Sequence, residues 1–175
     1  MNWLVIVAAA VAIIIAVLIW GFVRITRRTA DAAALLASVQ EKDIALLTQE
    51  CVRVCHSRLG VTLKLDDFDD TAQSLDYVLE PAQRTRMKTA FALPDHAGRF
   101  VLPLGAFIGE FVRAHHPGAR WVAREKGGLA MELRQNDSVM TMFPFDKVLK
   151  HAATGNAGEI LSYIQVATGR SAAAD

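Results

Sequence analysis

The fold is decided by residues 104–143, LGAFIGEFVRAHHPGARWVAREKGGLAMELRQNDSVMTMF. The first part of this stretch places apolar residues three and four positions apart, which is the spacing of a helix with one buried face. These residues are Leu104, Phe107, Ile108, Phe111, Val112 and, one turn later, His115. His116-Pro117-Gly118 then ends the predicted helix. From this point the sequence has the pattern of strands.

Three strand candidates follow the helix, at residues 120–124, 129–133 and 139–143. In the middle one, Leu129, Met131 and Leu133 alternate with smaller or charged residues, as in a half-buried strand. Gly127-Gly128 and Asn136-Asp137 supply the turns. Helical patterns lie on both sides of this region, at residues 35–59, 70–79, 81–91, 146–153 and 156–169. The predicted fold class is therefore α+β, with helices packed on a small three-stranded antiparallel β-meander.

An uncharged apolar run, WLVIVAAAVAIIIAVLIWGFV, occupies residues 3–23. At about 1.5 Å per residue it makes roughly 31 Å of helix, against a hydrocarbon core of about 30 Å. A cleaved signal peptide would have basic residues before the run, whereas Arg24, Arg27 and Arg28 follow it here. Positively charged flanks stay in the cytoplasm. We therefore expect an N-terminal transmembrane helix in the lipid bilayer, with the N-terminus outside and the C-terminal domain in the cytoplasm.

These patterns divide the 175 residues into four parts. Residues 1–28 are the predicted transmembrane anchor with its basic collar, and residues 29–59 are a membrane-proximal helix, either a stalk or part of the domain. Residues 60–169 form the predicted cytoplasmic α+β domain. Residues 170–175 are expected to be a disordered tail.

The charge balance argues against a nucleic-acid partner. Without the collar, 16 of the 19 basic residues face all 18 acidic ones, a formal charge of −2. A nucleic-acid binder would need a basic face to neutralise phosphates.

A stripe of small residues on the predicted membrane helix is the clearest indication of self-association. Ala8, Ala12 and Ala16 are spaced four apart, which gives the type of surface on which transmembrane helices pack. Because alanine is common in such helices, ordinary lipid contact is the alternative interpretation. A homo-oligomer through this helix is expected on the first interpretation.

Gly105 and Gly109 are the candidates for a ligand or partner site in the domain. They lie one turn apart, so one face of the predicted helix lacks side chains and lets a ring or backbone approach closely. Glu110 and Trp121 would line a groove at this face. The alternative is tight packing inside the domain, with Trp121 lying over the two glycines.

Glu110, His115 and His116 are the best candidates for acid and base catalysis. His115 falls on the apolar stripe, however, which favours a core histidine, and Glu110 can pair with Arg113 one turn away. The sequence has no glycine-rich phosphate loop, nucleophile elbow or HExxH motif. Catalysis and a cofactor are therefore not expected.

Two clusters invite a metal interpretation. Cys51 and Cys55 lie one helical turn apart with His56 beside them, but no second ligand pair follows, and buried structural thiols are favoured. The acidic group at residues 66–70 lacks the glycine and glutamate positions of a calcium loop. It fits a helix N-terminus, where the dipole favours negative charge. No metal site is expected.

The stretch Leu104 to Glu110, together with Trp121, the sequence PFDKV at 144–148 and Gly155, resembles bacterial domains of unknown function. Those families pair an LGAxxGE helix with a tryptophan-bearing strand and a P-F-x-K-V helix. The similarity extends over residues 66–168 and includes Ser74-Leu75-Asp76. It implies an α+β domain and a bacterial source, hence the inner membrane as location, but it carries no activity across.

The function expected from the sequence is a membrane-anchored binding or regulatory module whose partner is another protein. Two alternatives stay open. One is an immunity or inhibitor protein that neutralises a toxin, suggested by the small anchored α+β domain. The other is an enzyme of unknown reaction that uses Glu110 with His115 or His116.

Overall fold

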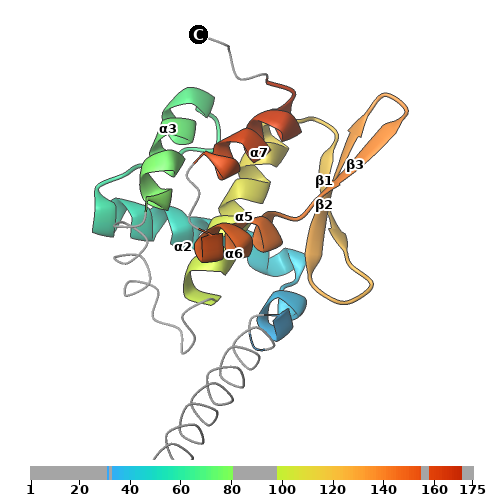
Figure 1. Ribbon diagram of the computed structural model, residues 1–175, viewed down its shortest axis with the longest axis horizontal. Helices are drawn as coiled ribbons and strands as arrows, with labels where there is room; N and C mark the ends of the chain where they lie inside the picture. The colour runs from blue at the N-terminus through green and yellow to red at the C-terminus, as the bar shows by residue number, and fades with distance from the viewer. Residues whose placement is uncertain (1–30, 32, 81–97, 155–157, 171–175) are drawn as a thin grey trace, which may run out of the picture. The chain divides into compact units, whose positions relative to one another are not determined.

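The computed structural model describes residues 31, 33–80, 98–154 and 158–170 (Figure 1). Residues 1–35 and 36–175 are two separate compact units, and the elements below belong to the second. Their order along the chain is α2 (Glu41–Leu59), α3 (Phe68–Leu79), α5 (Gly98–His115), β1 (Ala119–Ala123), β2 (Leu129–Gln135), β3 (Ser138–Met142), α6 (Pro144–Thr154) and α7 (Glu159–Thr168).

Helix α5 forms the centre of the domain. It contacts α2, α6, α7 and β1, and Figure 1 shows it among the other helices with the sheet to one side. Leu104, Phe107 and Phe111 on this helix are fully buried. The apolar period that predicts the helix thus supplies the largest side chains of the core.

The central helix starts earlier than the sequence pattern indicates. Proline lacks an N–H and clashes with the preceding turn, so Leu104 after Pro103 is the natural predicted start. In the structure α5 begins at Gly98 and contains Pro103. Pro103 lies near the N-terminus of α5, and its missing N–H removes one helical hydrogen bond there.

Helix α2 belongs to the domain rather than to a stalk. The chain leaves helical geometry at Val39 and Gln40, and the Gln40 N–H donates to Asp43 Oδ2 at 3.0 Å to start α2. Its apolar face, with Val54 and both cysteines, is buried, and the helix ends at Gly60 in the left-handed conformation, as predicted. The compact unit begins at Leu36 and includes α2, in agreement with the second of the two interpretations left open for residues 29–59.

The sheet is the predicted three-stranded antiparallel meander, in the order β1-β2-β3. Trp121 pairs with Met131, and Met131 pairs with Met142. Leu129, Met131 and Leu133 are buried and Arg134 is exposed, as the alternation along β2 predicts, whereas Ala130 is buried as well. One face of the sheet thus packs on the domain core.

The turn between β1 and β2 depends on two glycines. The Arg124 N–H donates to the Gly128 carbonyl at 3.0 Å, and Gly127 has a φ of 83°, which suits a three-residue hairpin loop. A Cβ on Gly128 would lie 2.5 Å from the Leu36 carbonyl oxygen. Gly128 therefore lets the turn pack against the first residues of the domain.

The predicted fold class is wrong in its transmembrane helix. None of the helices in the part of the chain that the structure describes is long and apolar enough to cross a membrane. Helices α2, α3 and α6 carry charged side chains among their apolar ones, and α5 contains Arg99, Glu110 and Arg113. Residues 3–23 and the stripe of Ala8, Ala12 and Ala16 lie outside the described residues, as do the predicted helix at 81–91 and the tail at 171–175.

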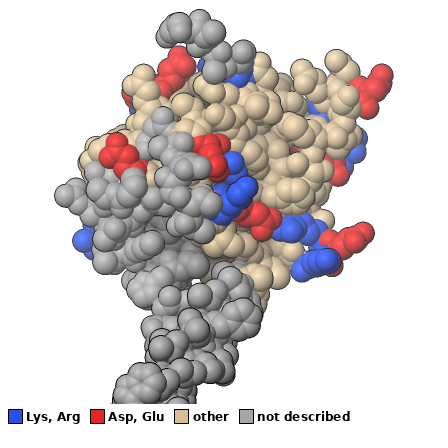
Figure 2. Space-filling view, viewed as in Figure 1, with Lys and Arg blue, Asp and Glu red and all other residues tan. Residues whose placement is uncertain are grey.

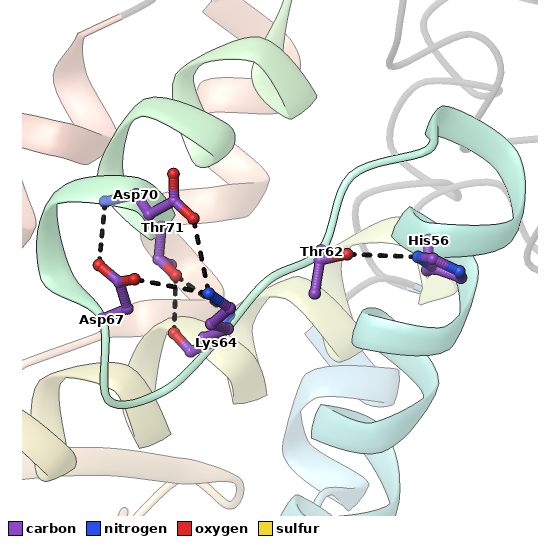
Figure 3. Close-up of polar contacts among 6 residues, drawn as sticks. All are labelled: His56, Thr62, Lys64, Asp67, Asp70 and Thr71. Carbon is purple, nitrogen blue, oxygen red and sulfur yellow. Dashed lines mark hydrogen bonds and ion pairs between the residues drawn. The ribbon is translucent and has the colours of Figure 1, made fainter.

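The acidic group starts a helix, as predicted (Figure 3). Asp67 is the N-cap of α3, and its Oδ1 accepts the Asp70 N–H at 3.2 Å. Lys64 Nζ lies 3.6 Å from Asp67 and 3.7 Å from Asp70. Thr71, buried, donates to the Lys64 carbonyl at 2.7 Å and accepts the Lys64 N–H at 3.0 Å. The Asp67 carboxylate thus accepts a hydrogen bond from a helix N–H, and Asp67 and Asp70 both pair with Lys64.

Replacing the N-cap should destabilise the domain modestly. Asp67→Ala removes the acceptor of the Asp70 N–H, and we expect a loss of about 1 kcal/mol in the free energy of unfolding. Chemical denaturation measures it. Asp69→Ala, at an exposed carboxylate in the first turn that does not cap, is the control with a smaller expected loss. Equal losses in the two variants would contradict the capping role.

Candidate functional site

The glycine face of α5 is filled by two aromatic rings. A Cβ on Gly105 would lie 2.5 Å from Cδ1 of Phe145, and one on Gly109 would lie 2.1 Å from Cζ2 of Trp121. The Trp121 and Phe145 rings are 5.6 Å apart. Because real Cβ contacts are never so short, both positions require glycine in this packing.

Glu110 holds the tryptophan in place. The Trp121 Nε1–H donates to Glu110 Oε1 at 2.8 Å, and Arg113 pairs with the other carboxylate oxygen. The Glu110 side chain is mostly buried, so these donors compensate its desolvation. The carboxylate therefore fixes the ring across the helix.

The structure brings together all four residues of the predicted groove, Gly105, Gly109, Glu110 and Trp121. It does so in the alternative arrangement, tight packing inside the domain, because Trp121 and Phe145 occupy the space over the glycines. The four residues join α5 to β1 and α6. In this arrangement Trp121 is 7% exposed and the Glu110 side chain 12% exposed.

The two histidines also have structural contacts. His115 packs on the rings of Phe68 and Phe111, with centroids 5.3 and 4.5 Å away, and its Nδ1 lies 2.9 Å from the Phe111 carbonyl. His116 Nδ1 accepts the Gly118 N–H at 3.2 Å, in the turn before β1. Glu110 forms no hydrogen bond with either in the structure's described part.

The two cysteines are fully buried free thiols. A hydrogen bond to the neighbouring Cys55 thiol, with burial, raises the pKa of Cys51 well above its usual value. His56 lies on the exposed side of α2, with Nδ1 at 3.3 Å from Thr62 Oγ1 (Figure 3). Over the described ranges, no three side chains of the histidine, cysteine or acidic types are placed to hold a metal ion.

Burial should make both thiols unreactive in the native protein. The thiolate is the nucleophile, and Cys51 stays protonated at neutral pH because its pKa is raised. We expect iodoacetamide to modify neither thiol under native conditions and both in denaturant, as measured by intact mass. Cysteine introduced at exposed Leu46 on the same helix is the positive control. Modification of native Cys51 at the rate of that control would contradict the buried arrangement.

Strand β3 exposes apolar side chains that the sequence pattern does not mark. Val139 is 57% exposed, Met140 41% and the following Phe143 40%. Only Met142 of the strand is buried. Figure 1 shows the β2–β3 hairpin extending beyond the helices at its turn. The strand thus presents an apolar surface at the border of the sheet.

The outer edge of β3 is unpaired in its middle. On β2 the Arg134 N–H donates to the Gly118 carbonyl, on the side of β1. Because backbone groups of successive residues point to opposite sides of a strand, the N–H and carbonyl of Leu133 point to β3. Leu133 pairs with Met140, so the backbone of Met140 points to β2 and that of Val139 and Thr141 points outward. No further strand pairs with this edge within the described residues.

Tyr163 closes the edge at its C-terminal end. The Phe143 N–H, which also points outward, donates to the Tyr163 hydroxyl at 2.8 Å, and the Phe143 carbonyl accepts the Lys147 N–H of α6. Burial raises the pKa of Tyr163, so the hydroxyl stays neutral. Arg124 covers the Phe143 ring at 5.0 Å. The open part of the edge is therefore Val139 to Thr141.

Charges of both signs are interspersed on the surface. On the face in Figure 2, basic and acidic side chains lie beside one another with uncharged surface between them. On the sheet, Arg120 Nη2 contacts Glu132 at 2.5 Å, and this hydrogen bond lowers the pKa of Glu132. We call the open outer edge of β3, Val139 to Thr141 with the exposed side chains of Val139 and Met140, the β3 edge.

No protein-family model, no curated protein and no solved structure matches this chain. The resemblance to bacterial domains of unknown function stays a prediction. Its motif residues have clear structural roles, however: Gly105, Gly109 and Glu110 receive Phe145 and Trp121. The motif therefore describes how α5 packs.

Proposed function

We propose that this domain is a protein-binding module that takes up a partner by strand addition at the β3 edge. The observation that carries the proposal is the coincidence of two features on one strand. The outward backbone groups of Val139 and Thr141 offer hydrogen bonds to an added strand. The exposed side chains of Val139 and Met140 offer apolar contact beside them.

The sequence of β3 supports this use of the edge. Natural edge strands are protected by charged side chains, proline or bulges, and SVMTM contains none of these. The strand is also short, which limits uncontrolled association. An edge left open in this way is suited to a specific and reversible partner.

The contacts of the enzyme candidates favour binding over the catalytic alternative. Glu110 is committed to Trp121 and Arg113, and His115 is packed between phenylalanine rings. An acid and base pair needs a shared substrate position within hydrogen-bond reach. The proposal therefore assigns these residues to the support of the fold.

Crosslinking in cells tests the proposal with matched variants. Val139→Glu places a charge on the β3 edge, and Val166→Glu makes the same change at a 69% exposed valine on α7. We expect the wild type and Val166→Glu to crosslink to the same protein partner and Val139→Glu to lose it. Equal recovery of every crosslinked protein by all three chains would contradict binding at the β3 edge.

The expected location at a bacterial inner membrane stays a prediction. Its orientation depends on Arg24, Arg27 and Arg28, which lie outside the described residues. A C-terminal reporter that is active only outside the cytoplasm tests the orientation. The prediction is an inactive reporter in the membrane fraction, and an active one would contradict it.

A further inference from the structure

We infer that the occupant of the β3 edge is a second copy of this chain, paired antiparallel about a two-fold axis at Met140. The inference rests on the proposed function and specifies its partner. It follows from the register of β3, from the place where the edge closes and from the charges around it. The resulting sheet would run without interruption through both copies.

The first step is the pattern of outward groups. The backbone N–H and carbonyl groups of Val139 and Thr141 point away from β2, and those of Met140 between them point toward β2. In an antiparallel pair, residues that exchange N–H···O bonds alternate with residues that do not. A two-fold axis at Met140 therefore pairs Val139 of each copy with Thr141 of the other. Every open backbone group in the middle of the edge is satisfied in this register.

The second step is the closed end of the edge. Because Tyr163 accepts the Phe143 N–H, no added strand can bond at Phe143. In the two-fold register, Ser138 lies opposite Met142 of the second copy, and Asn136 and Asp137 beyond it form the hairpin turn. The strand of each copy thus ends beside the Phe143 N–H of the other copy, which already donates to Tyr163. A register shifted toward Phe143 would lose this fit.

The charges on and around β3 also bear on the pairing. The five residues of β3 carry no charged side chain, so the axis brings no like charges together. Asp137 would lie near Phe143 of the second copy, whose ring is covered by Arg124. Arg124 already contacts Asp146 at 2.6 Å, and its guanidinium has further donors. Within β3 itself, pairing about this axis therefore brings no charged side chains together.

The small paired surface predicts a weak dimer. Stable dimers bury at least about 1,200 Å², and two five-residue strands with their exposed side chains provide less. We therefore expect self-association that rises with protein concentration. Sedimentation of the full chain in detergent should show monomer giving way to dimer as concentration increases.

Two variants test the pairing and its register. Thr141→Pro removes an outward N–H without touching the bonds to β2, so it should shift the chain to monomer while its unfolding stays cooperative. Met140→Cys should form an intermolecular disulfide under oxygen with a copper catalyst, because the facing Cα atoms would be about 4.5 Å apart. The native thiols are buried and do not compete.

The controls separate this interface from others. Val139→Cys and Val166→Cys should crosslink far less than Met140→Cys, because neither residue faces itself across the axis. Stronger crosslinking at Val139 would overturn the register. A dimer that survives Thr141→Pro would overturn the interface, as association through residues 3–23 would predict. A chain that stays monomeric but needs Val139 to bind another protein would overturn the second copy as occupant and leave the proposed function intact.

Discussion

Phe111→Ala is expected to lower the free energy of unfolding by about 4 kcal/mol, the largest effect of any substitution considered. Phe111 is fully buried in the C-terminal half of α5. Its ring lies 5.4 Å from that of Phe68, 4.5 Å from that of His115 and 6.1 Å from that of Phe107. Truncation removes apolar burial and leaves a cavity among residues of three different turns and two helices. Urea denaturation followed by circular dichroism measures the loss.

Phe143→Ala is the matched control for this prediction. Phe143 is 40% exposed and contacts the guanidinium of Arg124, so the same truncation should cost no more than about 1 kcal/mol. A loss at Phe143 as large as the one at Phe111 would mean that α5 is not the centre of the core.

Gly109→Ala is expected to lower the free energy of unfolding by about 2 kcal/mol. Alanine in a helix interior normally stabilises by about 1 kcal/mol relative to glycine, so the sign of the change is informative. Here the added Cβ would meet Cζ2 and Cη2 of Trp121 at 2.1 and 2.3 Å. The ring must move, and its bond to Glu110 must lengthen or break. The same denaturation experiment measures the change.

A double-mutant cycle identifies the cause of this loss. Trp121→Phe removes the two ring atoms that the new Cβ would meet, so Gly109→Ala should cost less in that background. We expect a coupling energy of at least about 1 kcal/mol between the two positions. Additive effects would show that Trp121 does not lie over Gly109.

The sequence predicts those elements whose determinants are local. The alternation through Leu129, Met131 and Leu133 predicts β2, and Gly60 and Gly169 predict helix ends that have left-handed glycines in the structure. The acidic group at residues 66–70 predicts the start of α3 because the helix dipole favours negative charge there, and in the structure Asp67 caps the helix. The three-stranded meander follows from turns placed between short strands.

Other features depend on packing and escape a local pattern. Proline usually breaks a helix, but Pro103 lies inside α5. Helix α2 belongs to the core because α5 packs on its apolar face. The transmembrane helix of the predicted fold is the part corrected by the structure, because no helix in the described part of the chain is long and apolar enough to cross a membrane.

The four residues of the candidate site lie together in the structure, in the packed arrangement that the sequence allows beside the ligand groove. Gly105 and Gly109 predict a close approach, and whether a ligand or a ring fills the space depends on where Trp121 and Phe145 lie. Conversely, Val139 and Met140 are ordinary residues for a strand, so the sequence pattern does not indicate that they are exposed. Only the absence of a covering element over them in the described structure reveals the β3 edge.

Site-specific photo-crosslinking at Val139 in cells identifies directly what binds the β3 edge. A photoreactive amino acid at this position reports what lies within a few ångströms of the β3 edge, and the same group at Val166 reports the surface of α7. The account predicts a discrete protein adduct at Val139 that is absent at Val166, with twice the mass of the chain if the partner is a second copy. Adducts of equal yield at both positions, or none at Val139, would contradict binding at the β3 edge.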